Sequence, residues 1–462
     1  MIDQIFLAAQ SAVSVSITWH TTGIANPNLV AWGATSSLEQ PLATAVPFPV
    51  PSGSSGSYHT ITLAGLTLGQ AYFYAVSDDD GTFSPVKSFT IPDRNRVVIV
   101  AYGDQGVSTL SGAPADTGEP GFPEKMISLI NSKEPLIHCI LANGDLSYAN
   151  KRAATLDACQ PYIDAWFRMI RPVTERAAFM PSMGNHDMLT PDHYLSYLNR
   201  FVLPPNGLVD NVPAVGSNQE RFYAFRLGSV LIVSIDSNNE YGEGDPQNLF
   251  LNNTLQASLT DPSVEWRIVF FHHPCFTNGA NHSPEDYLKW YVGEICQRGK
   301  VDIVVQAHNH LYERFHPLNI VQGIKPATTV TVVDTSGGPY TDPTRPIYAT
   351  TGGGGAFLYN FVTTRPDWNY KAVPPLVTHH YMRLEVTGDL LSIQTIDENG
   401  AIIDSTSIRK TSLAPPIQPP PPITVTVPNV EGMAEAIALT TLSNAGLVAS
   451  VSNRINSDTV LV

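Results

Sequence analysis

The chain carries little charge of either sign, and the shortage is greatest among the basic residues. Charged residues make up 15% of its 462 residues, well below the usual quarter or so. Lysine and arginine number 26 against 41 aspartates and glutamates, which gives a formal net charge of −15. So acidic a chain is a poor partner for nucleic acid or an anionic membrane. An anionic substrate is not excluded, because bound metal ions reverse the local field.

Cysteine is also scarce, and long apolar runs are lacking. No apolar run approaches the roughly 18–20 residues of a membrane-spanning helix. The start, Met1 to Gln4, has no basic region followed by an apolar stretch, so no signal peptide is expected. Four cysteines without a C-x-x-C pair are too few for a disulfide scaffold. One or two disulfides or four buried thiols remain open for Cys139, Cys159, Cys275 and Cys296.

Residues 1–93 have the pattern of an all-β module. Apolar and small polar residues alternate in Val13–Trp19, which is typical of a half-buried strand. Turn-rich stretches separate it from further runs of the same kind. Together these runs resemble a fibronectin type III-like sandwich. The further runs are Leu29–Trp32, Tyr58–Leu63, Tyr72–Val76 and the closing Phe89–Pro92.

Residues 94–411 differ, because their apolar runs are continuous and alternate with helix-like segments such as Gly121–Asn131 and Pro284–Cys296. This pattern predicts an α/β (α+β) domain in which helices flank the sheets. Four of the five runs lead directly into a cluster of Asp, Asn or His, and ligands in such folds lie at the carboxyl ends of strands. The runs are Val97–Ala101, Ile137–Ala142, Val230–Ile235, Trp266–Phe271 and Val301–Val305.

The end of the chain has a third composition. Residues 412–423 contain six prolines within eight residues, which predicts a stiff, extended linker. Residues 424–462 begin with Val427–Met433, continue with a helical stretch over Ala434–Ala445 and then read Gly446-Leu447. This order resembles the opening of a PASTA repeat, a module associated with peptidoglycan recognition. We expect a truncated PASTA-like repeat at the end of a fragment of a longer protein.

Five polar clusters follow one another along residues 94–411. Their side chains offer only oxygen and nitrogen donors, which suit Fe, Mn or Zn. Seven donors suffice for two ions if one carboxylate bridges, and two ions about 3.5–4 Å apart clamp a phosphoryl group for in-line attack. A tyrosine donor favours Fe(III), whose charge lowers the phenol pKa. Any one cluster alone is typical of a turn, but together they indicate a metal centre: Gly103–Gly106, Gly144–Tyr148, Gly184–Asp187, His272–Pro274 and His308–His310.

The set Asp-x-Gly, Gly-Asp-x-x-Tyr, Gly-Asn-His-Asp, Val-x-x-His and His-x-His resembles the purple acid phosphatases, within the calcineurin-like metallophosphoesterases. Val269–His272 supplies the fourth block, and His308–Arg314 the fifth with its trailing Tyr-Glu-Arg. The resemblance covers residues 1 to about 411. It implies a metallophosphoesterase β-sandwich flanked by helices, preceded by a fibronectin type III-like N-terminal domain. One departure is Ala307, where the family usually has glycine.

The resemblance also implies a metal ligand set. Asp145 would bridge both ions. Spacing from Val269 favours His272 as a ligand over His273, which we expect to orient the ligands or to be buried. Fe(III) would be held by Asp104, Tyr148 and His310, and the second, divalent ion (Fe, Zn or Mn) by Asn185, His272 and His308.

Three further residues receive catalytic roles from the resemblance. His186 would hydrogen-bond the substrate phosphate, and Asp187 would support it. His282, ten residues after His272, lies close to where plant-type members place substrate-contacting histidines. It would protonate the leaving alkoxide as a general acid; an exposed loop histidine is the alternative. Other candidates near the site are His379, His380 and Gly352–Gly355, whose missing side chains would permit close backbone approach.

We therefore expect a binuclear-metal acid phosphatase that hydrolyses phosphate monoesters by attack of a metal-bound hydroxide. One alternative is a phosphodiesterase or nucleotide pyrophosphatase on the same fold with Mn or Zn, against which Tyr148 argues. The other is a cell-wall-binding protein with a vestigial phosphoesterase domain, which the complete ligand set opposes. The expected partners are a small phosphate ester and peptidoglycan, without nucleic acid. The expected location is extracellular, periplasmic or at the cell surface. The natural substrate, second metal and oligomeric state stay open.

Overall fold

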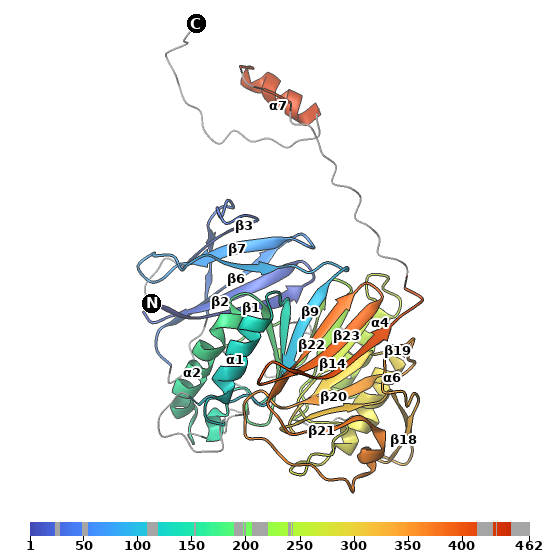
Figure 1. Cartoon of the computed structure of the whole chain (residues 1–462). Coiled ribbons are helices and arrows are strands. Elements are labelled where there is room, and N and C mark those ends of the chain that lie inside the picture. The colour runs from blue at the N-terminus through green and yellow to red at the C-terminus, as the bar shows by residue number, and fades with distance from the viewer. Residues whose placement is uncertain are drawn as a thin grey trace. The chain divides into compact units, whose positions relative to one another are not determined.

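The computed structural model divides the chain into two compact units, Met1–Leu413 and Ala414–Val462 (Figure 1). The division falls at the proline-rich linker expected over 412–423, of which residues 414–423 lie outside the described part of the chain. The described residues are 1–23, 28–48, 54–108, 119–151, 154–188, 197, 200–205, 220–238, 242, 244–413, 428–430 and 432–444.

The N-terminal residues form an all-β module, as the alternating pattern predicts. Its two sheets enclose a small apolar core around Trp19, which is fully buried. The indole N–H of Trp19 donates to the carbonyl of Ser77 at 3.0 Å. The strands are β1 (Ile2–Ser11), β2 (Ser14–Thr21), β3 (Leu29–Gly33), β4 (Ala43–Thr44), β5 (Val46–Phe48), β6 (Ser57–Ala64), β7 (Ala71–Val76) and β8 (Lys87–Thr90).

One sheet of this module continues into the next domain. Strand β1 pairs in parallel with β11 (Ala178–Ser182) at Leu7 and Ala178. The result is an eleven-stranded sheet in the order β19-β24-β23-β22-β9-β10-β11-β1-β2-β6-β5. The sheet therefore crosses the domain boundary expected at residue 93. Its other strands are β9 (Val97–Tyr102), β10 (Cys139–Asn143), β19 (Tyr340–Thr341), β22 (His380–Thr387), β23 (Leu390–Asp397) and β24 (Ile402–Arg409).

A second, seven-stranded sheet faces the first in the order β12-β13-β14-β15-β20-β16-β21. Its residues alternate between two cores: Ile268 and Ile303 belong to the core shared with the first sheet, whereas Val269 and Val304 belong to a core on the other face. The domain is thus a β-sandwich. The strands are β12 (Tyr223–Leu227), β13 (Val230–Ser234), β14 (Trp266–Phe270), β15 (Ile303–Gln306), β16 (Tyr312–Phe315), β20 (Ile347–Thr351) and β21 (Lys371–Leu376), beside a hairpin of β17 (Leu318–Gln322) and β18 (Thr328–Val332).

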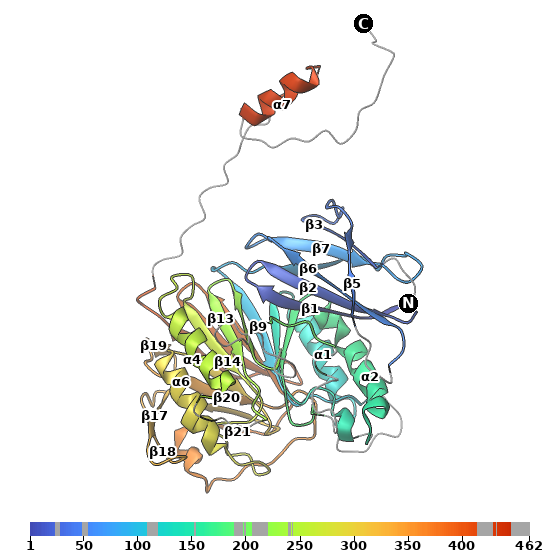
Figure 2. The ribbon, with the colours of Figure 1, turned by 180° about the vertical axis from the view of Figure 1, so that it is seen from behind.

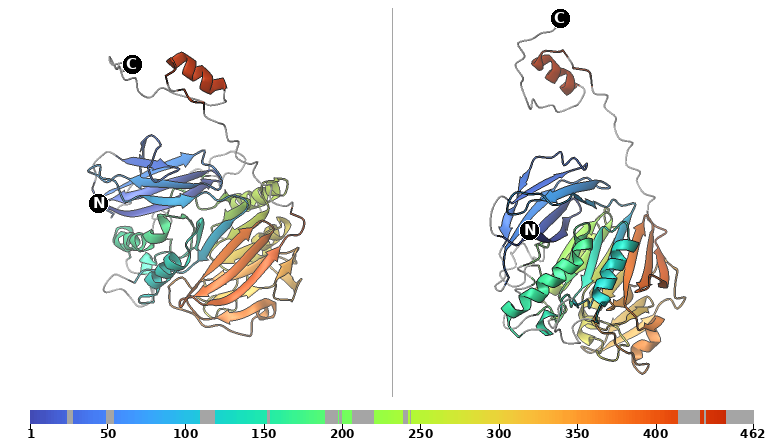
Figure 3. Two further views of the ribbon diagram at one scale, coloured as in Figure 1. Left: turned by 45° about the horizontal axis from the view of Figure 1, so that its top comes forward. Right: turned by 60° about the vertical axis from the view of Figure 1, so that its left-hand side comes forward.

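Helices cover both outer faces, which confirms the metallophosphoesterase sandwich flanked by helices. Helices α4 (Pro246–Ser258) and α6 (Glu294–Arg298) cover the seven-stranded sheet (Figure 2). Helices α1 (Phe122–Lys133) and α2 (Leu156–Thr174) lie side by side against the eleven-stranded sheet (Figure 3). The helix expected over 284–296 is divided into α5 (Asp286–Leu288), the π-helical turn η2 (Lys289–Gly293) and α6. Short 3-10 turns are η1 (Ala149–Lys151) and η3 (Pro366–Tyr370).

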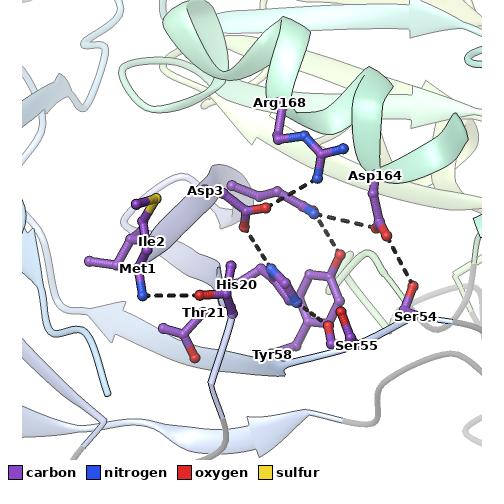
Figure 4. Close-up of polar contacts among 12 residues, drawn as sticks. Met1, Ile2, Asp3, His20, Thr21, Ser54, Ser55, Tyr58, Asp164 and Arg168 are labelled. Atoms are coloured by element: carbon purple, nitrogen blue, oxygen red, sulfur yellow. Dashed lines mark hydrogen bonds and ion pairs between the residues drawn. The ribbon is translucent and has the colours of Figure 1, made fainter. Parts of the chain in front are cut away.

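A polar network joins the N-terminal module to α2 (Figure 4). Asp3 accepts from His20 at 2.6 Å and from Arg168 at 3.2 Å. The fully buried Arg200 guanidinium donates to the Tyr58 hydroxyl at 2.6 Å and to Asp164 at 2.7 Å. Buried charges of this kind are stable only when paired, so this network fixes the module against the helix.

The remaining expectations concern cysteines, membrane spans and the C-terminal unit. All four cysteines are buried thiols, and none of them forms a disulfide within the described part of the chain. Among the described residues no helix is both long and apolar enough to cross a bilayer. Within the second unit, the expected helix is present as α7 (Glu435–Asn444). The rest of the PASTA-like pattern falls largely outside the described residues.

Candidate metal centre

The five polar clusters lie at the carboxyl ends of parallel strands from both sheets. Strands β9, β10 and β11 are parallel neighbours in one sheet, and β14 and β15 are parallel neighbours in the other. Strands β9 and β10 end directly before their clusters, and one residue separates each of the other three strands from its cluster. Since carboxyl ends of parallel strands form a common edge, the clusters meet there. Of these five strands, β11, which precedes Gly184–Asp187, was not predicted from the sequence.

Three of the predicted iron ligands converge on one another, and we call Asp104, Tyr148 and His310 the tyrosine group. The Tyr148 hydroxyl lies 3.1 Å from Oδ1 of Asp104 and 3.0 Å from Nε2 of His310. The last two atoms are 3.3 Å apart. All three side chains are buried.

The other four predicted ligands form the asparagine group, centred on His272. Its Nε2 atom lies 3.1 Å from Oδ1 of Asn185, 3.0 Å from Nδ1 of His308 and 3.4 Å from Oδ2 of Asp145. The same Nε2 lies 3.9 Å from Oδ1 of Asp104. The two groups are therefore contiguous, and the fold brings all seven predicted ligands together.

Hydrogen bonds to backbone carbonyls orient two of the imidazole rings. The Nδ1 atom of His272 lies 2.8 Å from the carbonyl of Asn143, and Nδ1 of His310 lies 2.6 Å from the carbonyl of Phe357. A carbonyl can only accept, so Nδ1 carries the proton in both rings. In the neutral ring Nε2 then presents a lone pair to the centre, as a metal ligand requires.

The backbone around the ligands adopts an unusual conformation. Asp104, Asp145, Tyr148 and His308 have φ values of 57°, 53°, 52° and 70°. Residues other than glycine rarely adopt this left-handed conformation, because it costs about 1–3 kcal/mol for each residue. Such strain persists where the surroundings determine the geometry. Four of the seven predicted ligands are held in this way.

The charges in the centre favour a cation. Asp104 and Asp145 are 0% and 1% exposed, and within the described part of the chain their ion-pair partners are histidines. Burial would raise the pKa of Asp145, but His272 and His186 hold it well below its usual value. Against the opposing effect of burial, Asp145 and Asp104 raise the pKa of His272 to about 9. The proton on His272 therefore offsets part of the negative charge of the two buried carboxylates. A bound metal cation would offset that charge in its place.

Tyr148 responds to the same field. Burial and the carboxylate of Asp104 raise the pKa of its phenol well above the usual value. A cation between these side chains acts in the opposite direction, because it stabilises the phenolate. Buried carboxylates, bare imidazole nitrogens and a phenol therefore fit a pair of hard or borderline metal ions.

His273 lies at the edge of the asparagine group. Ring nitrogens of His272, His273 and His308 lie within 4.8 Å of one another. The Nδ1 atom of His273 lies 2.9 Å from Oγ of Ser237, which also accepts the His273 backbone N–H at 2.9 Å. Burial, together with the charge of His272, lowers the pKa of His273 to about 3. His272, rather than His273, contacts both carboxylates.

His186 faces the centre, whereas Asp187 lies behind it. The Nε2 atom of His186 is 4.0 Å from Oδ2 of Asp145, and its ring packs 4.5 Å from that of Tyr148. The carboxylate of Asp187 accepts the backbone N–H groups of Asp145, Leu146 and Gly184 at 2.8–3.0 Å. Burial and Asp145 raise its pKa to about 7. Asp187 thus braces the ligand loops rather than the ring of His186, which bonds Asn150 at 3.1 Å.

His282 is half-buried beside the asparagine group, not on a free loop. Its ring centroid lies 3.8 Å from that of His308. Burial lowers its pKa. Its backbone N–H and carbonyl bond the side chain of Asn309. The ring of His282 therefore packs against a predicted metal ligand.

The two rim candidates His379 and His380 are buried and bond other groups. His379 bonds Glu119 at 3.0 Å, and His380 bonds the carbonyl of Thr378 at 2.9 Å. The glycines do allow close approach, because a Cβ on Gly352 would lie 2.7 Å from Oδ2 of Asp104. Similarly, a Cβ on Gly103 would lie 2.5 Å from that of Ala307.

Several side chains that contact the site residues were not predicted from the sequence. Tyr359 stacks on His310 with ring centroids 3.8 Å apart and planes 12° from parallel. Ser237 and Asn309 bond His273 and His282, as described above. Of these, only Asn309 had a sequence signal, because it stands between two predicted ligands.

Two parts of the chain match known protein families. Residues 2–91 match the family profile of the purple acid phosphatase N-terminal domain, and residues 115–312 match that of calcineurin-like phosphoesterases. An uncharacterized protein of Mycobacterium tuberculosis is 26% identical over 374 residues, covering 75% of this chain and 67% of that protein. Purple acid phosphatase 18 of Arabidopsis thaliana is 22% identical over 379 residues, covering 79% and 75%.

Solved structures share the fold. A purple acid phosphatase from yellow lupin (Lupinus luteus) seeds has a TM-score of 0.72 at 19% identity and covers 88% of this chain and 74% of its own. The structure titled PhoD has a TM-score of 0.58 at 12% identity, covering 88% and 93%. The chain therefore combines a purple acid phosphatase N-terminal domain with a calcineurin-like phosphoesterase domain in a metallophosphoesterase fold.

Proposed function

We propose that the chain is a binuclear-metal acid phosphatase that hydrolyses phosphate monoesters. The observation that carries the proposal is the contact between the tyrosine and asparagine groups. Their seven donors are buried or half-buried and meet where strands of both sheets end. The tyrosine group would hold Fe(III), the asparagine group a divalent Fe, Zn or Mn ion, and Asp145 would bridge. A relative in Arabidopsis thaliana, 25% identical over 319 residues, is named an Fe(3+)-Zn(2+) purple acid phosphatase.

The chain's own residues divide the remaining work. Bound ions would polarise the phosphoryl group and lower the pKa of the attacking water. His186, beside Asp145, would hold a phosphate oxygen through Nε2. His282 would donate a proton to the leaving oxygen. Asp187 would keep the loops of Asp145 and Gly184 in register.

The first experiment measures the visible spectrum and metal content of the purified protein after reconstitution with iron and zinc. A purple band with about two metal ions per chain would support Tyr148 bound to Fe(III). A colourless protein with two manganese or zinc ions would contradict the iron assignment and favour the phosphodiesterase alternative. A protein that takes up neither metal would overturn the proposal and favour the vestigial, cell-wall-binding alternative.

Substrate class needs a separate assay. Equal concentrations of a phosphate monoester and a diester with the same leaving group are compared on the reconstituted protein at acidic pH. We expect the monoester to react faster. Faster diester turnover would replace the monoesterase with a phosphodiesterase at the same centre.

We also propose a location outside the cytoplasm, with peptidoglycan contact through residues 424–462. Its support is the PASTA-like sequence and the helix α7. The test compares sedimentation with purified peptidoglycan for the whole chain and for residues 1–411. Equal sedimentation of the two proteins would contradict a binding role for the C-terminal segment.

A further inference from the structure

We propose that Asn309 is a positioning residue that holds His282 against the metal centre. The inference rests on the proposed function, in which His282 protonates the leaving oxygen. Asn309 lies between the predicted ligands His308 and His310. One short segment would therefore set the position of both the metal ligands and the proton donor.

The side chain of Asn309 is fully buried and makes three hydrogen bonds to the loop that carries His282. Its Oδ1 accepts the backbone N–H of His282 at 3.3 Å. Its Nδ2 donates to the carbonyl of His282 at 3.2 Å and to Oγ1 of Thr277 at 3.0 Å. The amide thus clasps both backbone groups of His282, the pattern expected of a group that fixes a loop position.

The loop over residues 277–282 is packed tightly against this amide. A Cβ added at Gly279 would collide with the Asn309 side chain. At its start, the hydroxyl of Thr277 and the backbone N–H of Asn278 donate to Glu313 at 2.7 and 2.8 Å. Glu313 therefore anchors the beginning of the loop, and Asn309 anchors the end that carries His282.

A second bond supports His282 from outside. Arg365 donates to the His282 carbonyl at 2.7 Å. Asn309 also binds the His282 N–H, which Arg365 does not reach. Loss of Asn309 should therefore loosen the loop without releasing it, and the ring contact between His282 and His308 should weaken.

The expected chemical consequence depends on the leaving group. As the bond between phosphorus and the ester oxygen breaks and water oxygen bonds phosphorus, His282 gives its proton to the departing oxygen, which leaves as an alcohol. The attacking water releases a proton to solvent, and solvent returns a proton to His282 before the next turnover. An alkoxide needs that proton, whereas a dinitrophenolate is stable without it. Misplacing His282 should therefore slow alkyl esters selectively.

The test compares propyl phosphate with 2,4-dinitrophenyl phosphate on iron- and zinc-reconstituted full-length protein. For Asn309→Leu we expect kcat/KM to fall about 10- to 100-fold for propyl phosphate and less than about 3-fold for the aryl ester. Gly279→Ala should behave alike, since it displaces the loop while keeping Asn309. Gly242→Ala is the matched control, because a Cβ there meets no atom of the described residues within 4 Å. Metal content should equal that of the wild type in all three variants.

A double variant completes the test. Asn309→Leu combined with His282→Gln should lose no more activity on propyl phosphate than His282→Gln alone, because both changes remove one proton transfer. Equal losses on both esters, or additive losses in the double variant, would overturn the inference. A wild type that hydrolyses neither ester would overturn the proposed function, and the inference with it. A wild type active on both esters, with an unchanged ratio in both variants, would remove the inference alone.

Discussion

The backbone N–H of His186 donates a 2.7 Å hydrogen bond to Oδ1 of Asp145. This bond uses one oxygen of the carboxylate and leaves Oδ2 facing Nε2 of His272 at 3.4 Å. Asp145 is therefore held by one ligand loop while its free oxygen points into the centre. A carboxylate placed in this way is suited to bridging two ions.

Asp145→Ala should remove both ions and activity. The variant loses the carboxylate that faces the asparagine group, and we expect metal content to fall from about two ions per chain to below one. Elemental analysis and a phosphatase assay measure the result. Asp261→Ala is the control, because its side chain is 44% exposed and Asp261 belongs to none of the five polar clusters. An Asp145 variant that keeps two ions and full activity would contradict the ligand assignment.

Tyr148→Phe should remove the purple colour while the asparagine group keeps its divalent ion. The phenol oxygen lies within hydrogen-bond distance of Asp104 and His310, so its loss takes a donor from the tyrosine group only. Absorption spectra and metal analysis check this. In Tyr348→Phe the colour should persist, because the Tyr348 hydroxyl has no hydrogen-bond partner in the described part of the chain. A purple Tyr148 variant would rule out this residue as the source of colour.

Glu313→Gln should alter the pH dependence of stability. Burial raises the pKa of Glu313 from 4.5 to about 7, so between these values the folded protein holds a proton that the unfolded chain has lost. The stability that this group contributes is therefore complete below pH 4.5 and falls as the pH rises to about 7, by about 3–4 kcal/mol. Gln cannot ionise, so the variant should show a flatter profile of unfolding free energy. Parallel profiles would contradict this prediction.

Arg200→Met should destabilise the first unit strongly. Arg200 is fully buried and bonds Tyr58, Asp164 and Gln160 at 2.6–2.7 Å, so the variant leaves buried acceptors unpaired, at about 3–5 kcal/mol. Arg168→Met is the matched control, because the Arg168 side chain is 46% exposed and exposed pairs contribute about 0–1 kcal/mol. Denaturant unfolding of both variants gives the comparison. Equal losses of unfolding free energy in the two variants would contradict a larger contribution from the buried network than from an exposed ion pair.

The sequence predicted the strands around the centre because apolar runs of β9, β10, β14 and β15 are buried on both faces. Strand β1 was missed because Gln4 interrupts its apolar pattern. Gln4 is nevertheless fully buried, and its amide accepts from the Tyr58 hydroxyl at 2.7 Å. The prediction of one continuous helix over 284–296 was wrong. The helix departs from regular geometry where Gly293 packs closely on Ile320, since a Cβ at Gly293 would lie 2.5 Å from that side chain. Both differences arise from tertiary contacts that no local pattern contains.

The site was predictable where each donor follows a strand in a recognisable motif. Residues that act through contacts between distant segments carried no such motif. Tyr359 reaches His310 only because the chain after β20 returns to the centre. Asp187 was predicted to support His186, but the fold turns its carboxylate towards three backbone N–H groups.

The left-handed backbone at Asp104, Asp145, Tyr148 and His308 bears on whether the domain is a relic. Glycine would occupy each of these positions without conformational penalty. The chain instead carries a side chain at all four positions and bears the strain that comes with it. Strain of this kind is typical of positions where the side chain itself is needed.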